Sequence, residues 1–123
     1  MRKVAERPTI LVVDDEPLTL MAAMDIIDSL GFRSIAAPNA DEAIAIMEHR
    51  DDVRAVFTDV NMPGSMDGVQ FACAVRKRWP PVKILVASGY PLNEPNLLPI
   101  GSAFLKKPYG FHALESGLRD VFA

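Results

Sequence analysis

The 123-residue chain contains one cysteine, and it lacks any apolar run long enough to cross a membrane. The single thiol, Cys73, excludes a disulfide within the chain and suits a reducing compartment. A spanning helix needs about 18 or more consecutive apolar residues, and the opening MRKVAERPT is too polar for a secretory signal. We therefore expect a cytoplasmic protein that does not enter a membrane.

The chain also lacks an excess of positive charge. Its formal net charge is −3, with 13 basic and 16 acidic residues. Domains that bind nucleic acid are usually basic, so we expect no direct DNA binding. Half of the residues are hydrophobic, which suits one soluble core. Residues 1–123 are predicted to form a single domain, with residues 1–8 as an N-terminal extension.

Five short apolar runs are predicted to be strands. Most of them are continuous rather than alternating, which is typical of strands buried on both faces. The runs are Thr9–Val13, Ser34–Ala37, Val53–Thr58, Val82–Ala87 and Ala103–Lys106.

Helical patterns separate these runs. The first is Pro17–Leu30, with apolar residues at spacings of three (Met21, Met24, Ile27 and Leu30) before Gly31. Two more begin with capping pairs, Asn39 with Glu42 and Asp67 with Gln70, and the last covers Gly110–Phe122. This alternation predicts an α/β fold, a doubly wound five-stranded parallel sheet with helices on both faces.

Reactive side chains follow the predicted strands. The first strand is followed by Asp14 and Asp15, the third by Asp59, the fourth by Ser88 and the fifth by Lys107. Ligands of such sheets bind beyond the carboxyl ends of the strands, so these groups should meet at one edge. Three carboxylates there predict a site for a hard cation, and Mg²⁺ is the expected ion.

The motifs ILVVDDE, TDVNMPGSMDG, VASGY and FLKKP, in this order, resemble the receiver domain of bacterial two-component response regulators. The resemblance covers nearly the whole chain and implies a flavodoxin-like sheet of order 2-1-3-4-5. It further implies a phosphorelay protein that takes a phosphoryl group from a sensor histidine kinase or a phosphotransfer protein. Its downstream target would be another protein, which the sequence does not identify.

The resemblance also implies roles for individual residues. Asp59 would be the phosphoacceptor, and Asp15, Asp59 and the backbone carbonyl of Asn61 would hold Mg²⁺. Asp14 would contact the ion through water. The protein would thus be a phosphoacceptor rather than an enzyme, with at most self-phosphorylation and self-dephosphorylation.

The resemblance implies a switch as well. Ser88 and Lys107 would bind oxygens of the phosphoryl group. As Ser88 is drawn toward the phosphate, Phe104 would turn into the space that it leaves.

The chain departs from the family pattern in three places. MPGSMDG is one residue longer than the usual loop, and Phe104 replaces a commoner tyrosine. Three prolines, Pro91, Pro95 and Pro99, predict that the helix before the fifth strand is shortened or irregular. The SGYP sequence beginning at Ser88 is similar to an SGY-type receiver subgroup that often occurs as stand-alone proteins.

The sequence disfavours two other functions. A Mg²⁺-dependent aspartyl-phosphate phosphatase carries its nucleophile on the first strand and a second acid two residues later. Here Asp14 is followed by Asp15, Glu16 and Pro17, but the candidate nucleophile Asp59 is on the third strand rather than the first, which argues against this function. A receiver-like scaffold that is never phosphorylated would have no need of the site residues, all of which are present.

Overall fold

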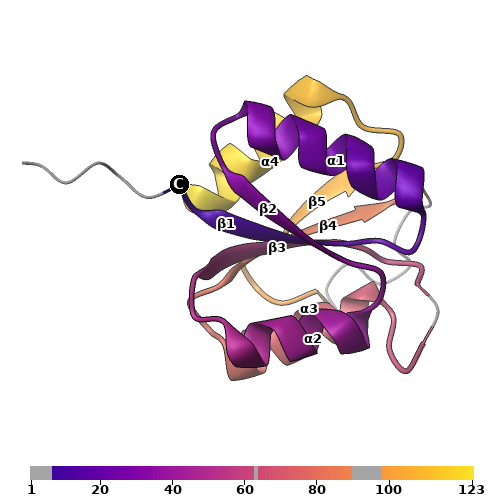
Figure 1. The fold of residues 1–123 in the computed structure, drawn as a ribbon, viewed down its shortest axis with the longest axis vertical. Coiled ribbons are helices and arrows are strands. Elements are labelled where there is room, and N and C mark those ends of the chain that lie inside the picture. The colour runs from indigo at the N-terminus through magenta and orange to yellow at the C-terminus, as the bar shows by residue number, and fades with distance from the viewer. Residues whose placement is uncertain (1–6, 63, 90–97) are drawn as a thin grey trace, which may run out of the picture.

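A computed structural model describes residues 7–62, 64–89 and 98–123. Its five strands form one parallel sheet of order β2-β1-β3-β4-β5, which confirms the predicted fold class and strand order (Figure 1). The strands are β1 Thr9–Val13, β2 Arg33–Ala37, β3 Val53–Asp59, β4 Lys83–Ser88 and β5 Ala103–Lys106.

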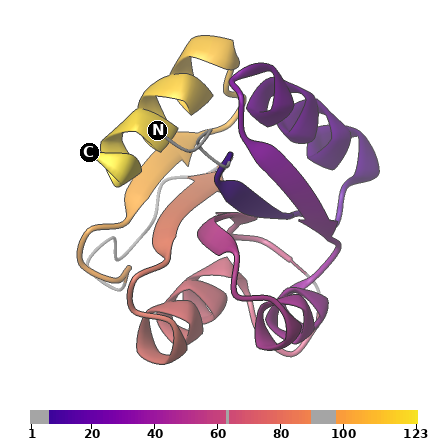
Figure 2. The ribbon, with the colours of Figure 1, turned by 60° about the vertical axis from the view of Figure 1, so that its left-hand side comes forward.

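Four helices in the described residues cover the sheet in two layers. They are α1 Pro17–Ser29, α2 Ala40–His49, α3 Gly68–Arg78 and α4 Phe111–Phe122. Helices α1 and α4 lie on one face, and α2 and α3 lie on the other (Figures 1 and 2). Each face therefore has its own core, built around Ile27 and Leu114 on one side and around Met47 and Phe71 on the other.

The middle strands explain the continuous apolar runs in the sequence. All five residues of β1 are buried, as are five of the six in β4, because helices pack on both faces of these strands. The edge strands β2 and β5 are more exposed. Burial of β1, β3 and β4 therefore positions the residues that follow them.

The helix boundaries follow capping interactions. The Asn39 side chain accepts a hydrogen bond from the Glu42 N–H, and Asp67 and Gln70 form a reciprocal capping box. Glu16 accepts from the Leu18 N–H at 2.9 Å and caps α1. Gly31, with φ of 94°, ends the turn after α1.

The predicted apolar stripe of α1 is partly wrong. Met21 is 60% exposed, whereas Ala23 and Ile27 are fully buried. A helix turns by about 100° per residue, so successive steps of three residues drift around its axis rather than staying on one face. The predicted stripe of Met21, Met24, Ile27 and Leu30 therefore does not face the core along its whole length, and Met21 is on the exposed side of α1.

The segment between β4 and β5 is only partly described. Residues 90–97 lie outside the described residues, and with them most of the predicted shortened or irregular helix. Leu98, which follows them, packs against the core beneath α2 and α3. Within the described part of the chain, no helix has the length and apolarity that crossing a bilayer requires.

Candidate functional site

The carboxyl ends of four neighbouring strands form the site. Strand pairing places Val13 beside Thr58, Asp59 beside Ala87, and Ser88 beside Lys106. The residues that follow β1, β3, β4 and β5 are thus adjacent, as the sequence predicts. This edge, on the right of the sheet in Figure 1, is called the acidic edge and is defined by Asp14, Asp15 and Asp59.

The three carboxylates of the acidic edge lie close together. One oxygen from each of Asp14, Asp15 and Asp59 lies within 4.8 Å of the others. Asp14 is buried, Asp59 is partly buried, and Asp15 is exposed. At that separation, an ionised pair repels by roughly 3.5 kcal/mol at an effective dielectric constant of about 20.

Lys107 is the cation that contacts this cluster. Its Nζ lies 3.3 Å from Asp59 Oδ2 and 3.4 Å from Asp14 Oδ2. The backbone N–H of Lys107 donates to the Ser88 carbonyl at 2.8 Å, which ties the end of β5 to β4. One ammonium against three carboxylates leaves two negative charges, so the cluster favours a further cation.

Burial, with a smaller effect of neighbouring carboxylates, raises the pKa of two groups at the site. Burial raises the pKa of Asp59 above its usual range, and the Asp14 carboxylate adds to the rise. Lys107 and a hydrogen bond from the Asn61 backbone act in the opposite direction, but they do not cancel the rise. Burial, together with the Asp14 and Asp59 carboxylates, raises the pKa of Tyr109 to about 12.

The donor set fits Mg²⁺. This ion takes oxygen ligands, commonly one or two carboxylates, and keeps several of its waters. Asp15 and Asp59 supply carboxylates, and the exposed position of Asp15 leaves room for water. Asp14 is held by the Glu16 N–H, which donates to its Oδ1 at 2.9 Å. Glu16 itself caps α1 and does not belong to the cluster.

The remaining predicted site residues lie around the cluster. Ser88 is 2% exposed at the end of β4, and Phe104 is 40% exposed on β5, where it pairs with Val86. Asn61 follows β3 and hydrogen-bonds to the Asp59 side chain through its backbone N–H. The roles of the Asn61 carbonyl, of Ser88 and of Phe104 stay predictions.

Sequence reasoning missed Gly68. A Cβ placed on this residue would lie 2.0 Å from the Asp59 carbonyl oxygen and 2.7 Å from the Val60 Cα. The Gly68 N–H donates to the Val60 carbonyl at 2.8 Å, so the first turn of α3 rests directly on the backbone of Asp59. The MDG sequence contains this glycine, but nothing in the local pattern shows that it meets β3.

We expect Gly68→Ala to weaken both Mg²⁺ binding and phosphorylation, because the methyl group must displace the Asp59 backbone or α3. Gly117→Ala is the matched control, since its Cβ would crowd Leu85 and Leu105 side chains at 3.1–3.3 Å, away from the acidic edge. Calorimetric titration measures the Mg²⁺ affinity, and intact mass measures the extent of phosphorylation. Both should be lower in Gly68→Ala than in Gly117→Ala, even where the two variants have similar melting temperatures. Equal losses in both would mean that Gly68 affects stability alone.

Comparison with known proteins agrees with this geometry. Residues 10–119 match the family model of the response regulator receiver domain. The probable chemotaxis protein CheY of Rhizobium etli is 30% identical over 97% of this chain and 95% of its own length. The hydrogenase transcriptional regulatory protein HoxA of Cupriavidus necator is 35% identical over 85% of this chain, and the matched part is 22% of HoxA.

Solved structures share the fold. A response regulator receiver protein from Sinorhizobium medicae superposes with a TM-score of 0.88 and 27% identity, covering 96% of this chain and 97% of that one. The receiver domain of the hybrid histidine kinase CckA gives a TM-score of 0.79 at 25% identity, over 94% and 99% of the two chains.

Proposed function

The chain belongs to the response regulator receiver domain family, the phosphoacceptor domains of two-component signalling, and on this premise we propose that Asp59 is its phosphoacceptor. The observation that carries the proposal is the position of the Asp59 carboxylate. It ends a central strand, lies 3.3 Å from the Lys107 ammonium, and belongs with Asp14 and Asp15 to a carboxylate cluster that could hold a cation.

The chemistry is transfer of a phosphoryl group. An Asp59 carboxylate oxygen attacks the phosphorus of a phosphohistidine on a sensor histidine kinase or a phosphotransfer protein. The N–P bond breaks as the O–P bond forms, and its electron pair returns to the imidazole, which takes up a proton. Such transfers depend mainly on positioning the reactants and on neutralising the charge of the phosphoryl oxygens.

The residues around Asp59 supply that environment. Asp15, Asp59 and the Asn61 carbonyl would hold Mg²⁺, and Asp14 would contact it through water. When bound there, the ion would supply positive charge against the carboxylates and the phosphoryl oxygens. Lys107 already lies beside Asp59 and would pair with one phosphoryl oxygen, while the Ser88 hydroxyl would donate to another.

The signal would pass through Ser88 and Phe104. Ser88 is buried at the end of β4, and Phe104 is partly exposed on the neighbouring strand. Movement of Ser88 toward the phosphate would let Phe104 turn inward, a two-state change in packing. We propose that a downstream protein reads this change.

We further propose that residues 1–123 act in the cytoplasm as one receiver domain with residues 1–8 as an extension. Any catalysis would be limited to addition and loss of the domain's own phosphate. Nothing found favours a phosphatase or a scaffold that is never phosphorylated.

Asp59→Asn should abolish phosphorylation, because an amide cannot form the acyl phosphate. Incubation with Mg²⁺ and acetyl phosphate should add one phosphate to the wild type, read by intact mass. Asp25→Asn, the same change at an exposed position on α1, should behave as the wild type. Phosphate on the Asp59→Asn protein would place the acceptor elsewhere.

Asp15→Asn should weaken Mg²⁺ binding at least severalfold, because it removes a charged ligand from a site with few protein ligands. Calorimetry is the suitable measurement, since Trp79 should not report the ion. Helix α3 separates the capping residues Asp67 and Trp79 by about 18 Å along its axis. Equal affinity in the two proteins would contradict the metal assignment, and strong quenching of Trp79 by Mg²⁺ would contradict the placement of α3.

A further inference from the structure

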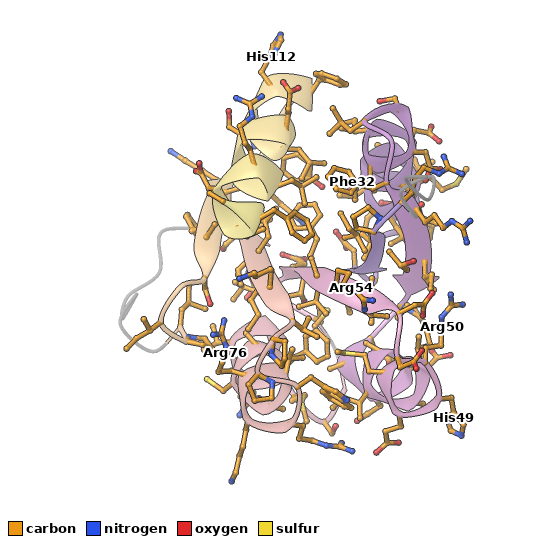
Figure 3. All side chains as sticks on the ribbon, turned by 90° about the vertical axis from the view of Figure 1, so that its left-hand side faces the viewer. Phe32, His49, Arg50, Arg54, Arg76 and His112 are labelled. Carbon is orange, nitrogen blue, oxygen red and sulfur yellow. The ribbon has the colours of Figure 1, made fainter. Side chains whose placement is uncertain are left out.

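Arginines gather at the opposite edge of the sheet, where the strands begin. We call it the basal edge and define it by Arg7, Arg33, Arg50, Arg54 and Arg78, which line two hollows there. Figure 3 looks onto this edge and shows Arg50 and Arg54 near the strand ends, between the two helical layers. Five arginines and only three acids (Glu48, Asp51 and Asp52) line these hollows, although the whole chain is acidic.

The register of β1 and β3 shifts at Arg54, and the Arg54 side chain is exposed. The β1–β3 register runs from Thr9↔Val53 to Ile10↔Ala55 and skips Arg54. Val53 and Ala55 are buried, whereas Arg54 is exposed. Bulges of this kind re-aim a side chain and recur beside functional sites. The irregularity therefore presents one guanidinium at the centre of the basal edge.

The charge of Arg54 is not neutralised by a carboxylate in the described part of the chain. Its Nη1 donates to the Asp51 carbonyl at 3.0 Å, which leaves four of its five N–H donors. By contrast, Arg50 forms two bonds to Asp52, at 2.8 and 2.6 Å, and Arg78 pairs with Glu48 at 2.7 Å. Arg7 and Arg33, like Arg54, have no carboxylate partner among the described residues.

Arg54 lies between the two hollows and lines both. One hollow, of about 760 Å³, has an apolar wall that includes Trp79, Pro80 and Val82. The other, of about 430 Å³, is lined by Arg7, Arg33 and Phe122. A compact ligand would fill only one hollow. An extended peptide can occupy both hollows and contact Arg54 between them.

We propose that the basal edge is a docking surface for an extended acidic peptide segment of a partner protein. Carboxylates of the segment pair with Arg54, Arg33 and Arg7, and an apolar side chain enters the hollow beside Trp79. The planar guanidinium binds a carboxylate through two parallel bonds, and the Arg50–Asp52 pair shows this geometry at the same edge.

The acids of the basal edge favour a peptide over a continuous polyanion. Glu48, Asp51 and Asp52 alternate with the arginines and would repel the unbroken phosphate array of a nucleic acid or of a lipid surface. A peptide can place separate carboxylates opposite Arg54, Arg33 and Arg7, which have no carboxylate partner among the described residues. Since the acidic edge lies at the other ends of the strands, docking leaves the Asp59 site accessible.

A labelled probe peptide tests the proposal. A twelve-residue peptide of Glu and Gly with one central Leu should bind the wild type at low ionic strength, read by fluorescence anisotropy, and bind less tightly as salt is added. Arg54→Ala should weaken binding about tenfold, the value of a lost charged hydrogen bond. Arg119→Ala, the same charge change on exposed α4 outside both hollows, should weaken it less than about twofold.

Two further readouts make the test specific. The peptide should change the fluorescence of Trp79, the single tryptophan, because Trp79 lines the larger hollow. Mg²⁺ should leave this fluorescence unchanged. Asp59→Asn should bind the peptide as the wild type does, so failure of the phosphoacceptor proposal and failure of this one are distinguishable. Arg33→Ala serves as a second variant if circular dichroism shows that Arg54→Ala does not fold.

Three results would overturn the proposal. The first is absence of peptide binding to the folded wild type at low ionic strength. The second is an equal loss of peptide affinity in Arg54→Ala and Arg119→Ala, which would show that the peptide is attracted by the overall charge of the protein. The third is tighter binding to a single-stranded DNA of twelve nucleotides, or to phosphatidylglycerol vesicles, than to the peptide.

Discussion

Repulsion among the carboxylates of Asp14, Asp15 and Asp59 is the interaction on which the site depends. Burial of apolar side chains on both faces of β1 and β3 brings these acids together, because the strands cannot pair in register without aligning their ends. Lys107 removes only part of the repulsion. The fold therefore maintains an excess of negative charge that favours binding of a divalent cation.

The backbone around the cluster keeps this arrangement in place. Gly68 lets α3 rest on the Asp59 backbone, and the bond from the Lys107 N–H to the Ser88 carbonyl joins the ends of β4 and β5. A phosphoryl group on Asp59 would thus be in reach of groups from several strands. The basal edge has the opposite charge and lies at the other ends of the same strands, so the two surfaces can act independently.

Much of this structure could be predicted from the sequence, because it depends on local patterns. Strand and helix bounds agree within about one residue, and Asp14 and Asp59 meet Lys107 at one edge of the sheet as expected. The features that were missed depend on pairing between distant segments. The contact of Gly68 with Asp59 and the bulge at Arg54 both arise from neighbours that periodicity does not reveal. The exposure of Met21 shows that apolar residues at steps of three do not share one helix face.

The free energy of unfolding of wild type and Asp59→Asn, with and without Mg²⁺, tests the account most directly. Burial raises the pKa of Asp59 in the native state. Ionisation of Asp59 therefore lowers the free energy of unfolding as the pH rises above about 3.9, the pKa of an aspartate in the unfolded chain.

Without Mg²⁺, the variant should be more stable than wild type near pH 7, and this difference in stability should vanish near pH 3. Mg²⁺ at ten times its dissociation constant should stabilise wild type by about 1.4 kcal/mol, and the variant by less. A variant less stable than the metal-free wild type at pH 7 would contradict the account.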